Sequence, residues 1–224
     1  MKFKTLVLSA SLLFSQMAMA GLIGINDTSV IGNGNAATDG NNLTLDTVTN
    51  LQWLDVTLST GVSYDFIEAN AGAGQVFGGF RHATLDEVTQ FVTNAGFVSI
   101  NTEEPANQTA AKNLQELIGV TNPVNPGSWE RTLATYDSQL PFAWATDLHR
   151  TASISWHSSP SLGGAAFLTN FSNMYDDQGS PDIGHFLVRT SSGGAAPTDE
   201  PGILMMLFAS LLAFSSRRKV RARG

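Results

Sequence analysis

The segment that most clearly constrains the fold reads TLDEVTQFVTNAG, from Thr84 to Gly96. Thr84 and Glu87 have the spacing of a capping box, in which the Thr84 hydroxyl accepts from a backbone N–H of the first turn and Glu87 reaches back to the Thr84 N–H. Apolar residues then recur at helical spacing, and Gly96 follows as a C-terminal cap; they are Leu85, Val88, Phe91 and Val92. The segment therefore predicts an amphipathic helix with one face in a core.

The residues around this helix predict three further local structures. Residues 43–55 alternate apolar and polar side chains on both sides of Thr49-Asn50, which is typical of a hairpin with its apolar face in the core. Short helices are expected at residues 63–70 and 109–118. Residues 21–42 are rich in Gly, Asn, Asp, Ser and Thr, so we expect turns and surface loop there.

The pattern changes after Pro126 to short strands separated by Gly, Pro, Ser, Asn and Asp. The expected strands are residues 132–136, 142–146, 152–156, 165–170 and 186–189. Helices early and strands late indicate an α+β fold, a single domain with an antiparallel sheet and two main helices. This domain should span residues 21–190, followed by a flexible Ser-Gly-Ala-Pro linker at 191–198.

The N-terminus has the three parts of a signal peptide. Lys2 and Lys4 form a basic region, an apolar stretch follows, and Ala18-Met19-Ala20 supplies the small residues that signal peptidase accepts. We therefore expect residues 1–20 to be removed, which leaves Gly21 as the first residue of an exported protein.

The C-terminus carries an acidic-proline turn, an apolar segment and a basic end. The turn is Asp199-Glu200-Pro201, and the apolar run from Ile203 to Phe214 precedes five cationic residues that begin with Arg217 and Arg218. About 12 to 14 residues at about 1.5 Å each cover only about 20 Å, less than the roughly 30 Å of a hydrocarbon core. We expect a transient membrane helix at residues 202–216, with its cations on the cytoplasmic side.

These two ends resemble the PEP-CTERM class of exported bacterial proteins. In that class a Pro-Glu-Pro turn, a short hydrophobic helix and an Arg-rich end are recognised by exosortase, a membrane enzyme that acts near the turn. Residues 199–224 match this order, with Asp199 where the first proline stands. The resemblance implies a Gram-negative organism that makes exopolysaccharide, transient anchoring in the inner membrane, and final release to the outer surface or the extracellular matrix.

Charge and cysteine content exclude several functions. Seven of the 12 cationic residues lie in the two ends, so the body carries five, against 17 of the 19 acidic residues, a net charge of about −12. Nucleic acid is excluded as a partner, because binding phosphates requires clustered Lys and Arg. The chain has no cysteine, which excludes disulfides, thiol nucleophiles and thiolate metal sites.

The body also resembles a family, the exported proteins with an Lcl C-terminal type domain. The similar segments are Asp46-Thr-x-Thr-Asn-Leu-Gln-Trp53-Leu-Asp55, Gly78-Gly79-Phe80-Arg81-x-Ala83-Thr84-x-x-Glu87-Val88 and Gly184-His-Phe-Leu-Val-Arg189. Asn50, Phe80 and Ala83 replace the glycine, tryptophan and proline that the family often has. The resemblance implies a C-type-lectin-like α+β fold used for adhesion or glycan binding. It makes Trp53 and Phe80 core aromatics, and Arg81 an internally paired cation that holds the start of the helix to a strand.

Candidates for metal binding and catalysis are weak. The four histidines, His82, His149, His157 and His185, have no metal-ligand spacing. Asp176, Asp177 and Asp182 are close in one loop, which is a partial match to a calcium site and is otherwise a solvated acidic turn; no cofactor is expected. The chain has no Gly-x-Ser-x-Gly elbow, whereas paired carboxylates for glycoside hydrolysis stay an open alternative.

Aromatic residues favour a binding function. Sugar rings pack on aromatic faces, and the candidates are Trp129, Tyr136, Trp144, Trp156 and Tyr175. Alternatively, these side chains point inward and build the core. We therefore expect an exosortase-sorted surface or matrix protein with a non-catalytic binding or structural role in exopolysaccharide or biofilm. The alternatives are a glycan-active hydrolase on the same scaffold and an inert structural protein.

Overall fold

The structure is a computed structural model that describes residues 21–28, 30, 41–138 and 147–191. These residues fall within one compact unit, Met1–Ser191. The signal peptide, the expected strand at 142–146, most of the linker at 191–198, the sorting residues Asp199, Glu200, Pro201, Arg217 and Arg218, and the expected helix at 202–216 lie outside the described residues. Within the described ranges, no helix has the length and apolar character needed to cross a membrane.

A first sheet has the strand order β1-β2-β3-β10-β4, and each neighbouring pair is antiparallel. Its strands are β1 (Leu22–Ile25), β2 (Leu43–Asp46), β3 (Leu51–Leu54), β4 (Arg81–His82) and β10 (Leu187–Thr190). The expected hairpin is confirmed as β2 and β3, and Asn50 has a positive φ of 57° in its turn. The expectation of loop structure at 22–25 is wrong. These residues form an edge strand, because pairing with β2 satisfies their backbone groups despite the polar composition nearby.

A second sheet has the order β5-β6-β7-β8. Its strands are β5 (Asn122–Asn125), β6 (Trp129–Thr135), β7 (Leu148–His157) and β8 (Gly164–Tyr175), and the short β9 (Gly184–His185) pairs with β6 in parallel. Three of the expected strands are confirmed as β6, β7 and β8, each longer than expected. The antiparallel sheet expected from the sequence is thus divided into two, with one parallel pair added.

The helices occur where the sequence indicates them. They are α1 (Tyr64–Ala69), α2 (Leu85–Asn94) and α3 (Gln108–Ile118), with 3₁₀ turns at Val56–Ser59 and Pro105–Asn107. The capping box of α2 is present, with Thr84 accepting from the Glu87 N–H and Glu87 accepting from the Thr84 N–H. Gly96 follows α2 with a φ of 97°, a conformation that glycine adopts without strain.

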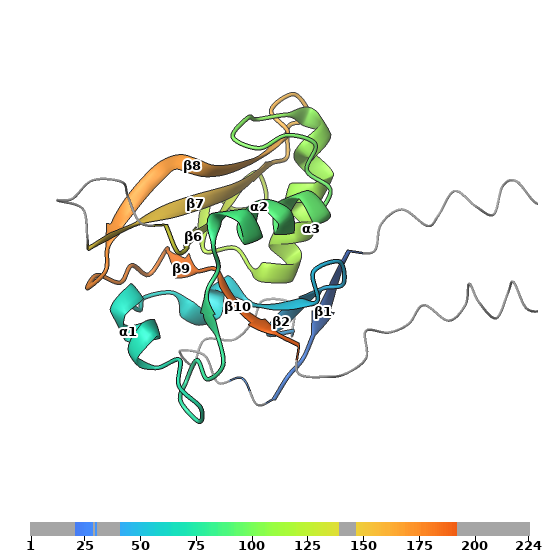
Figure 1. The fold of residues 1–224 in the computed structure, drawn as a ribbon. Coiled ribbons are helices and arrows are strands. Elements are labelled where there is room, and N and C mark those ends of the chain that lie inside the picture. Colours follow the sequence, from blue (N-terminus) through green and yellow to red (C-terminus); the bar gives the residue numbers. More distant parts are fainter. Residues whose placement is uncertain (1–20, 29, 31–40, 139–146, 192–224) are drawn as a thin grey trace, which may run out of the picture. The chain divides into compact units, whose positions relative to one another are not determined.

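The first sheet is buried on both faces by two apolar clusters. The larger cluster lies between this sheet, the helices α2 and α3, and the second sheet, and includes Trp53 stacked on Phe91 with ring centroids 4.0 Å apart. The smaller cluster lies against α1 and includes Ile67 and Phe80. Figure 1 shows α2 and α3 beside the strands β6, β7 and β8, with α1 near β10. Trp53 and Phe80 are core aromatics, as expected.

Phe186 connects the two sheets. It lies between β9 in the second sheet and β10 in the first, and its side chain is buried in the larger cluster. Its N–H donates to the Thr135 carbonyl at 2.9 Å, and its carbonyl accepts from the Ala83 N–H at 2.8 Å. One short segment of chain therefore belongs to both sheets and fixes their relative position.

Candidate functional site

A hollow of about 300 Å³ lies on the face of the second sheet that is turned away from α3. Ala152 and Ile154 of β7 point into the core under α3, so strand alternation directs the residues between them to the opposite face. We call this site the Trp129 hollow; its lining is Glu103, Trp129, Arg131, Ser153, Ser155, His157 and Phe167.

The aromatic wall of the Trp129 hollow is held in position by its neighbours. Trp129 is 36% exposed, and its ring stacks on that of His157, its cross-strand partner, with centroids 5.0 Å apart and planes 19° apart. The Arg131 guanidinium lies 5.1 Å from the centre of the Trp129 ring and donates to Asn122 Oδ1 at 2.9 Å. Glu103 Oε1 lies 3.5 Å from His157 Nε2. The wall is thus ordered before any ligand arrives.

Ser153 places a buried hydroxyl within this lining. The residue is 1% exposed, and its strand partners are Leu133 in β6 and Phe167 in β8. Its Oγ has no hydrogen-bond partner among the described residues. A buried hydroxyl without a partner costs free energy, on the order of 1–3 kcal/mol, so such groups are uncommon in folded proteins.

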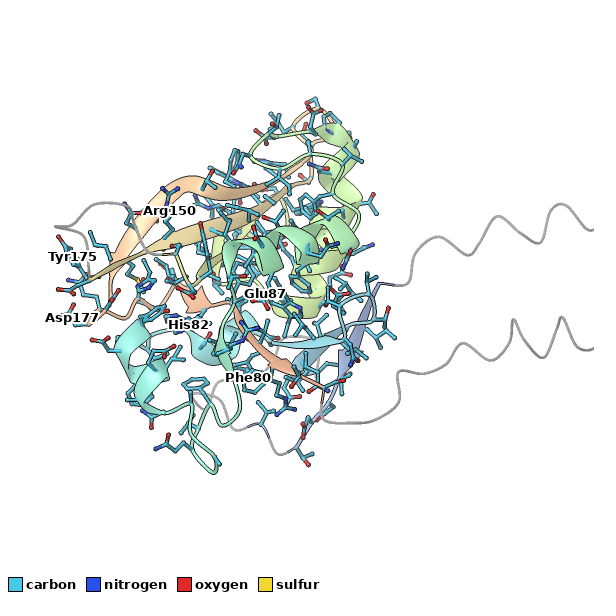
Figure 2. The ribbon with its side chains drawn as sticks, in the orientation of Figure 1. Phe80, His82, Glu87, Arg150, Tyr175 and Asp177 are labelled. Carbon is cyan, nitrogen blue, oxygen red and sulfur yellow. The ribbon has the colours of Figure 1, made fainter. Side chains whose placement is uncertain are left out.

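A second unusual site gathers three of the four histidines around Tyr64. The Tyr64 ring lies between His82 and His149, 3.7 Å from each and within 9° of parallel. His82 Nε2 is 3.1 Å from His185 Nδ1, and His185 Nε2 is 3.1 Å from the Val62 carbonyl oxygen. We call these four rings the histidine stack. Figure 2 shows His82 close to α1.

The protonation of the histidine stack follows from its contacts. The Val62 carbonyl only accepts, so His185 Nε2 donates to it and His185 Nδ1 accepts from His82 Nε2. Burial, followed by the nearby His149, lowers the pKa of His82 to about 3. Burial, followed by the nearby His82, lowers the pKa of His185 to about 3. Both rings are therefore neutral near pH 7.

One contact opposes this state. A neutral His82 that carries its proton on Nε2 has a lone pair on Nδ1, and this atom lies 2.8 Å from Glu68 Oε1. Both atoms are then acceptors, so a hydrogen bond between them needs one more proton. Glu68 would therefore favour a charged His82. However, its side chain is 54% exposed and screened by water, whereas the His82 side chain is 1% exposed. The cost of burying a charged imidazole therefore outweighs the attraction of Glu68, and His82 is neutral.

The histidine stack is suited to holding elements together rather than to catalysis. Tyr64 comes from α1, and the three histidines come from β4, β7 and β9. Burial, followed by the charge of Asp137, raises the pKa of Tyr64 well above its ordinary value, so its hydroxyl is not an activated nucleophile. The stack therefore fastens α1 to strands of both sheets.

The three carboxylates of the loop after β8 have different surroundings. Asp176 Oδ1 lies 2.6 Å from His149 Nδ1 at one end of the histidine stack, while Asp177 and Asp182 are exposed. Figure 2 shows Tyr175 and Asp177 at the far end of β8. Across the described residues, no three His, Asp or Glu side chains are arranged to hold a metal ion.

Residues of the three sequence motifs join neighbouring elements of the fold. Buried Asp46 accepts from the Val48 N–H at 2.9 Å and from Asn94 Nδ2 of α2 at 2.8 Å, which fixes the hairpin turn to the helix. Arg81 in β4 forms a two-pronged ion pair with Glu87, which ties strand to helix as expected, although the Arg81 side chain is 53% exposed rather than internal.

Arg189 and Gly79 line a different hollow, of about 350 Å³, beside the glycine-rich loop before β4. Arg189 donates to Gln52 Oε1 at 2.8 Å and to Asp27, and its guanidinium lies 4.7 Å from the centre of the Phe80 ring. Gly79 has a φ of 81°. Arg189 is thus already engaged by protein groups.

The five aromatic candidates separate into different environments. Tyr136 is buried and donates to the Leu168 carbonyl, and Trp156 packs against the core with Lys112 4.9 Å from its ring centre. Trp144 lies outside the described residues. Tyr175 is 54% exposed, and Trp129 is 36% exposed. Sequence reasoning missed Arg131, Ser153 and His157, although the alternation in β7 places the latter two on one face.

We compared the chain with protein-family models, with characterised proteins and with solved structures, and none of them matches it.

Proposed function

We propose that this chain is an exported surface or matrix protein, sorted by exosortase, whose C-type-lectin-like domain binds polysaccharide without cleaving it. The Trp129 hollow is the observation that carries the binding function. It combines an ordered aromatic wall with hydroxyl groups and both signs of charge, which are the groups that contact sugar rings and their hydroxyls. The order of motifs at the two ends supports export and sorting.

The lining of the Trp129 hollow favours binding over hydrolysis. Glycoside hydrolysis generally needs two carboxyl groups that flank the scissile bond, one of them as a proton donor. Among the described residues, the lining contains one carboxylate, Glu103. A hydrolase on this scaffold would therefore need its second carboxylate from elsewhere.

Retention on polysaccharide tests the binding function. The purified chain is incubated with the exopolysaccharide of the organism that carries the gene, and retention and new reducing ends are both measured. We expect retention without new reducing ends, and loss of retention in Trp129→Ala. Tyr175→Ala is the matched control, because Tyr175 is exposed but lies outside the hollow. Release of reducing ends would refute a non-catalytic function, and unchanged retention in Trp129→Ala would remove the hollow from it.

Mass spectrometry of the protein recovered from cells tests the sorting. We expect the mature chain to begin at Gly21 and to lack the tail beyond the turn at Glu200-Pro201. Deletion of the exosortase gene, or the double substitution Glu200→Ala and Pro201→Ala, should leave the tail attached. A tail that is retained in unmodified cells would contradict this part of the proposal.

A further inference from the structure

We propose that the Trp129 hollow binds about three consecutive units of an extended polysaccharide chain, which crosses the second sheet diagonally from Trp129 to Phe167. This inference rests on the proposed polysaccharide-binding function and adds the length, direction and shape of the bound segment. Three observations carry it: the register of three strands, the small side chains between the two aromatic residues, and the opposite charges on either side of the line that joins them.

The strand register places Trp129 and Phe167 at opposite corners of the hollow. Trp129 of β6 pairs with His157 of β7, whereas Phe167 of β8 pairs with Ser153, four residues away along β7. With about 3.3 Å per residue along a strand and about 4.8 Å between strands, the Cα atoms of the two aromatic residues are about 16 Å apart. This separation is about three times the length of one sugar unit in an extended chain, and a coiled chain would need more units to cover it.

Small side chains lie between the two aromatic residues. Ser155 is at the middle of the line, because it lies on β7 midway between the partners of Trp129 and Phe167. Its own partner in β8 is Ala165. The hollow has a volume of about 300 Å³, at the lower end of the range for small-molecule sites, so it accommodates one sugar unit. The units before and after it lie against Trp129 and Phe167, which are both partly exposed, so the chain leaves the hollow at both ends.

Charged side chains lie on either side of this line. Arg131 follows Trp129 by two residues on β6, so it shares the same face and lies on one side. Glu103 precedes Glu104, which is hydrogen-bonded to Gly164 at the outer edge of β8, and it lies on the other side. The faces of a sugar ring are apolar and its hydroxyls project from the rim, so a flat chain on the two aromatic side chains directs hydroxyls to both edges. A hydroxyl can accept from the Arg131 guanidinium and donate to the Glu103 carboxylate.

Fragments of the exopolysaccharide, separated by length, test the proposal. Monomers, dimers, trimers, tetramers and longer fragments compete with immobilised whole polysaccharide for the purified chain, and the concentration that displaces half of the protein is measured. We expect trimers to be about tenfold more effective than dimers, with little gain beyond tetramers, because only a trimer reaches both aromatic side chains. Phe167→Leu keeps an apolar side chain but removes the ring, so trimers should become about 2- to 10-fold less effective while dimers change much less.

Phe66→Leu is the matched control, because Phe66 is exposed on α1 outside the hollow, and it should change none of these values. Urea unfolding checks that Phe167→Leu is folded. Monomers as effective as trimers, displacement only by fragments longer than tetramers, or a length threshold that survives Phe167→Leu would overturn the diagonal path. In each of these cases, retention that is lost in Trp129→Ala would leave the binding function standing. Absence of retention in the unmodified chain would refute the proposed function, and this inference with it.

Discussion

Acidification should destabilise the protein through the histidine stack before carboxylates begin to titrate. His82 and His185 are buried and neutral in the folded state, where their pKa values are about 3, whereas an unfolded histidine has a pKa of about 6.5. The unfolded chain therefore binds more protons as the pH falls below about 6.5. Their contribution to stability is complete above that pH and is lost progressively towards about pH 3.

The magnitude follows from this difference in pKa. Between about pH 7.5 and pH 5, each of the two imidazoles should lower the free energy of unfolding by about 2 kcal/mol. The two rings are joined by a hydrogen bond, so about 4 kcal/mol is an upper limit for the pair. This is a large share of the roughly 5–15 kcal/mol that stabilises a typical domain.

Urea unfolding at several pH values and constant ionic strength, followed by tryptophan fluorescence, measures the effect. His82→Gln keeps a donor towards His185 but cannot ionise. The change in the free energy of unfolding with pH should therefore fall by about half, and this holds even if the variant is less stable at neutral pH. His157→Gln is the matched control, because it removes a histidine that lies outside the stack and leaves the contacts of His82 and His185 intact. A change below about 0.5 kcal/mol in the unmodified chain, or an unaltered slope in His82→Gln, would refute the neutral buried state.

Three further perturbations test individual contacts by urea unfolding. Glu68→Gln should stabilise the protein by about 0.5–1 kcal/mol at neutral pH, because its amide can donate to the lone pair on His82 Nδ1; destabilisation would show that His82 is charged. Thr84→Ala should cost about 1 kcal/mol through loss of the capping box, and an unchanged midpoint would mean that the cap does not contribute. Gly184→Ala should lower the free energy of unfolding by about 1–3 kcal/mol, because the added Cβ would overlap the Val56 carbonyl. The added Cβ of Gly24→Ala would meet only the movable side chain of Asn41, so this variant should lose less stability. Equal losses in the two variants would refute that reasoning.

The sequence predicted the helices and strands that are specified by residues within a single short segment. The capping box and the apolar spacing of α2 lie within one segment, and so do the alternation and turn of the β2–β3 hairpin. The strand β1 was not predicted, because its pairing with β2 depends on a partner 20 or so residues away rather than on its own composition. The division into two sheets likewise depends on long-range contacts.

The candidate site was predictable only in part. Trp129 was a candidate for sugar binding, but nothing in the sequence separates it from buried Tyr136, because exposure is decided by which face of a strand the core covers. The histidine stack could not be found from spacing at all. Tyr64, His82, His149 and His185 are far apart in sequence and meet only when α1 packs against strands of both sheets.

The position of Phe186 between β9 and β10 has a consequence for the timing of folding. β10 lies inside the first sheet, between β3 and β4, and β9 pairs with β6 in the second, so neither sheet can be completed before residues 184–190 have been synthesised. A shorter nascent chain lacks the partner of three earlier strands, and pairings over such separations form slowly. Completion of both sheets is thereby deferred until residues 184–190 are available, which suits a chain proposed to cross a membrane before it folds.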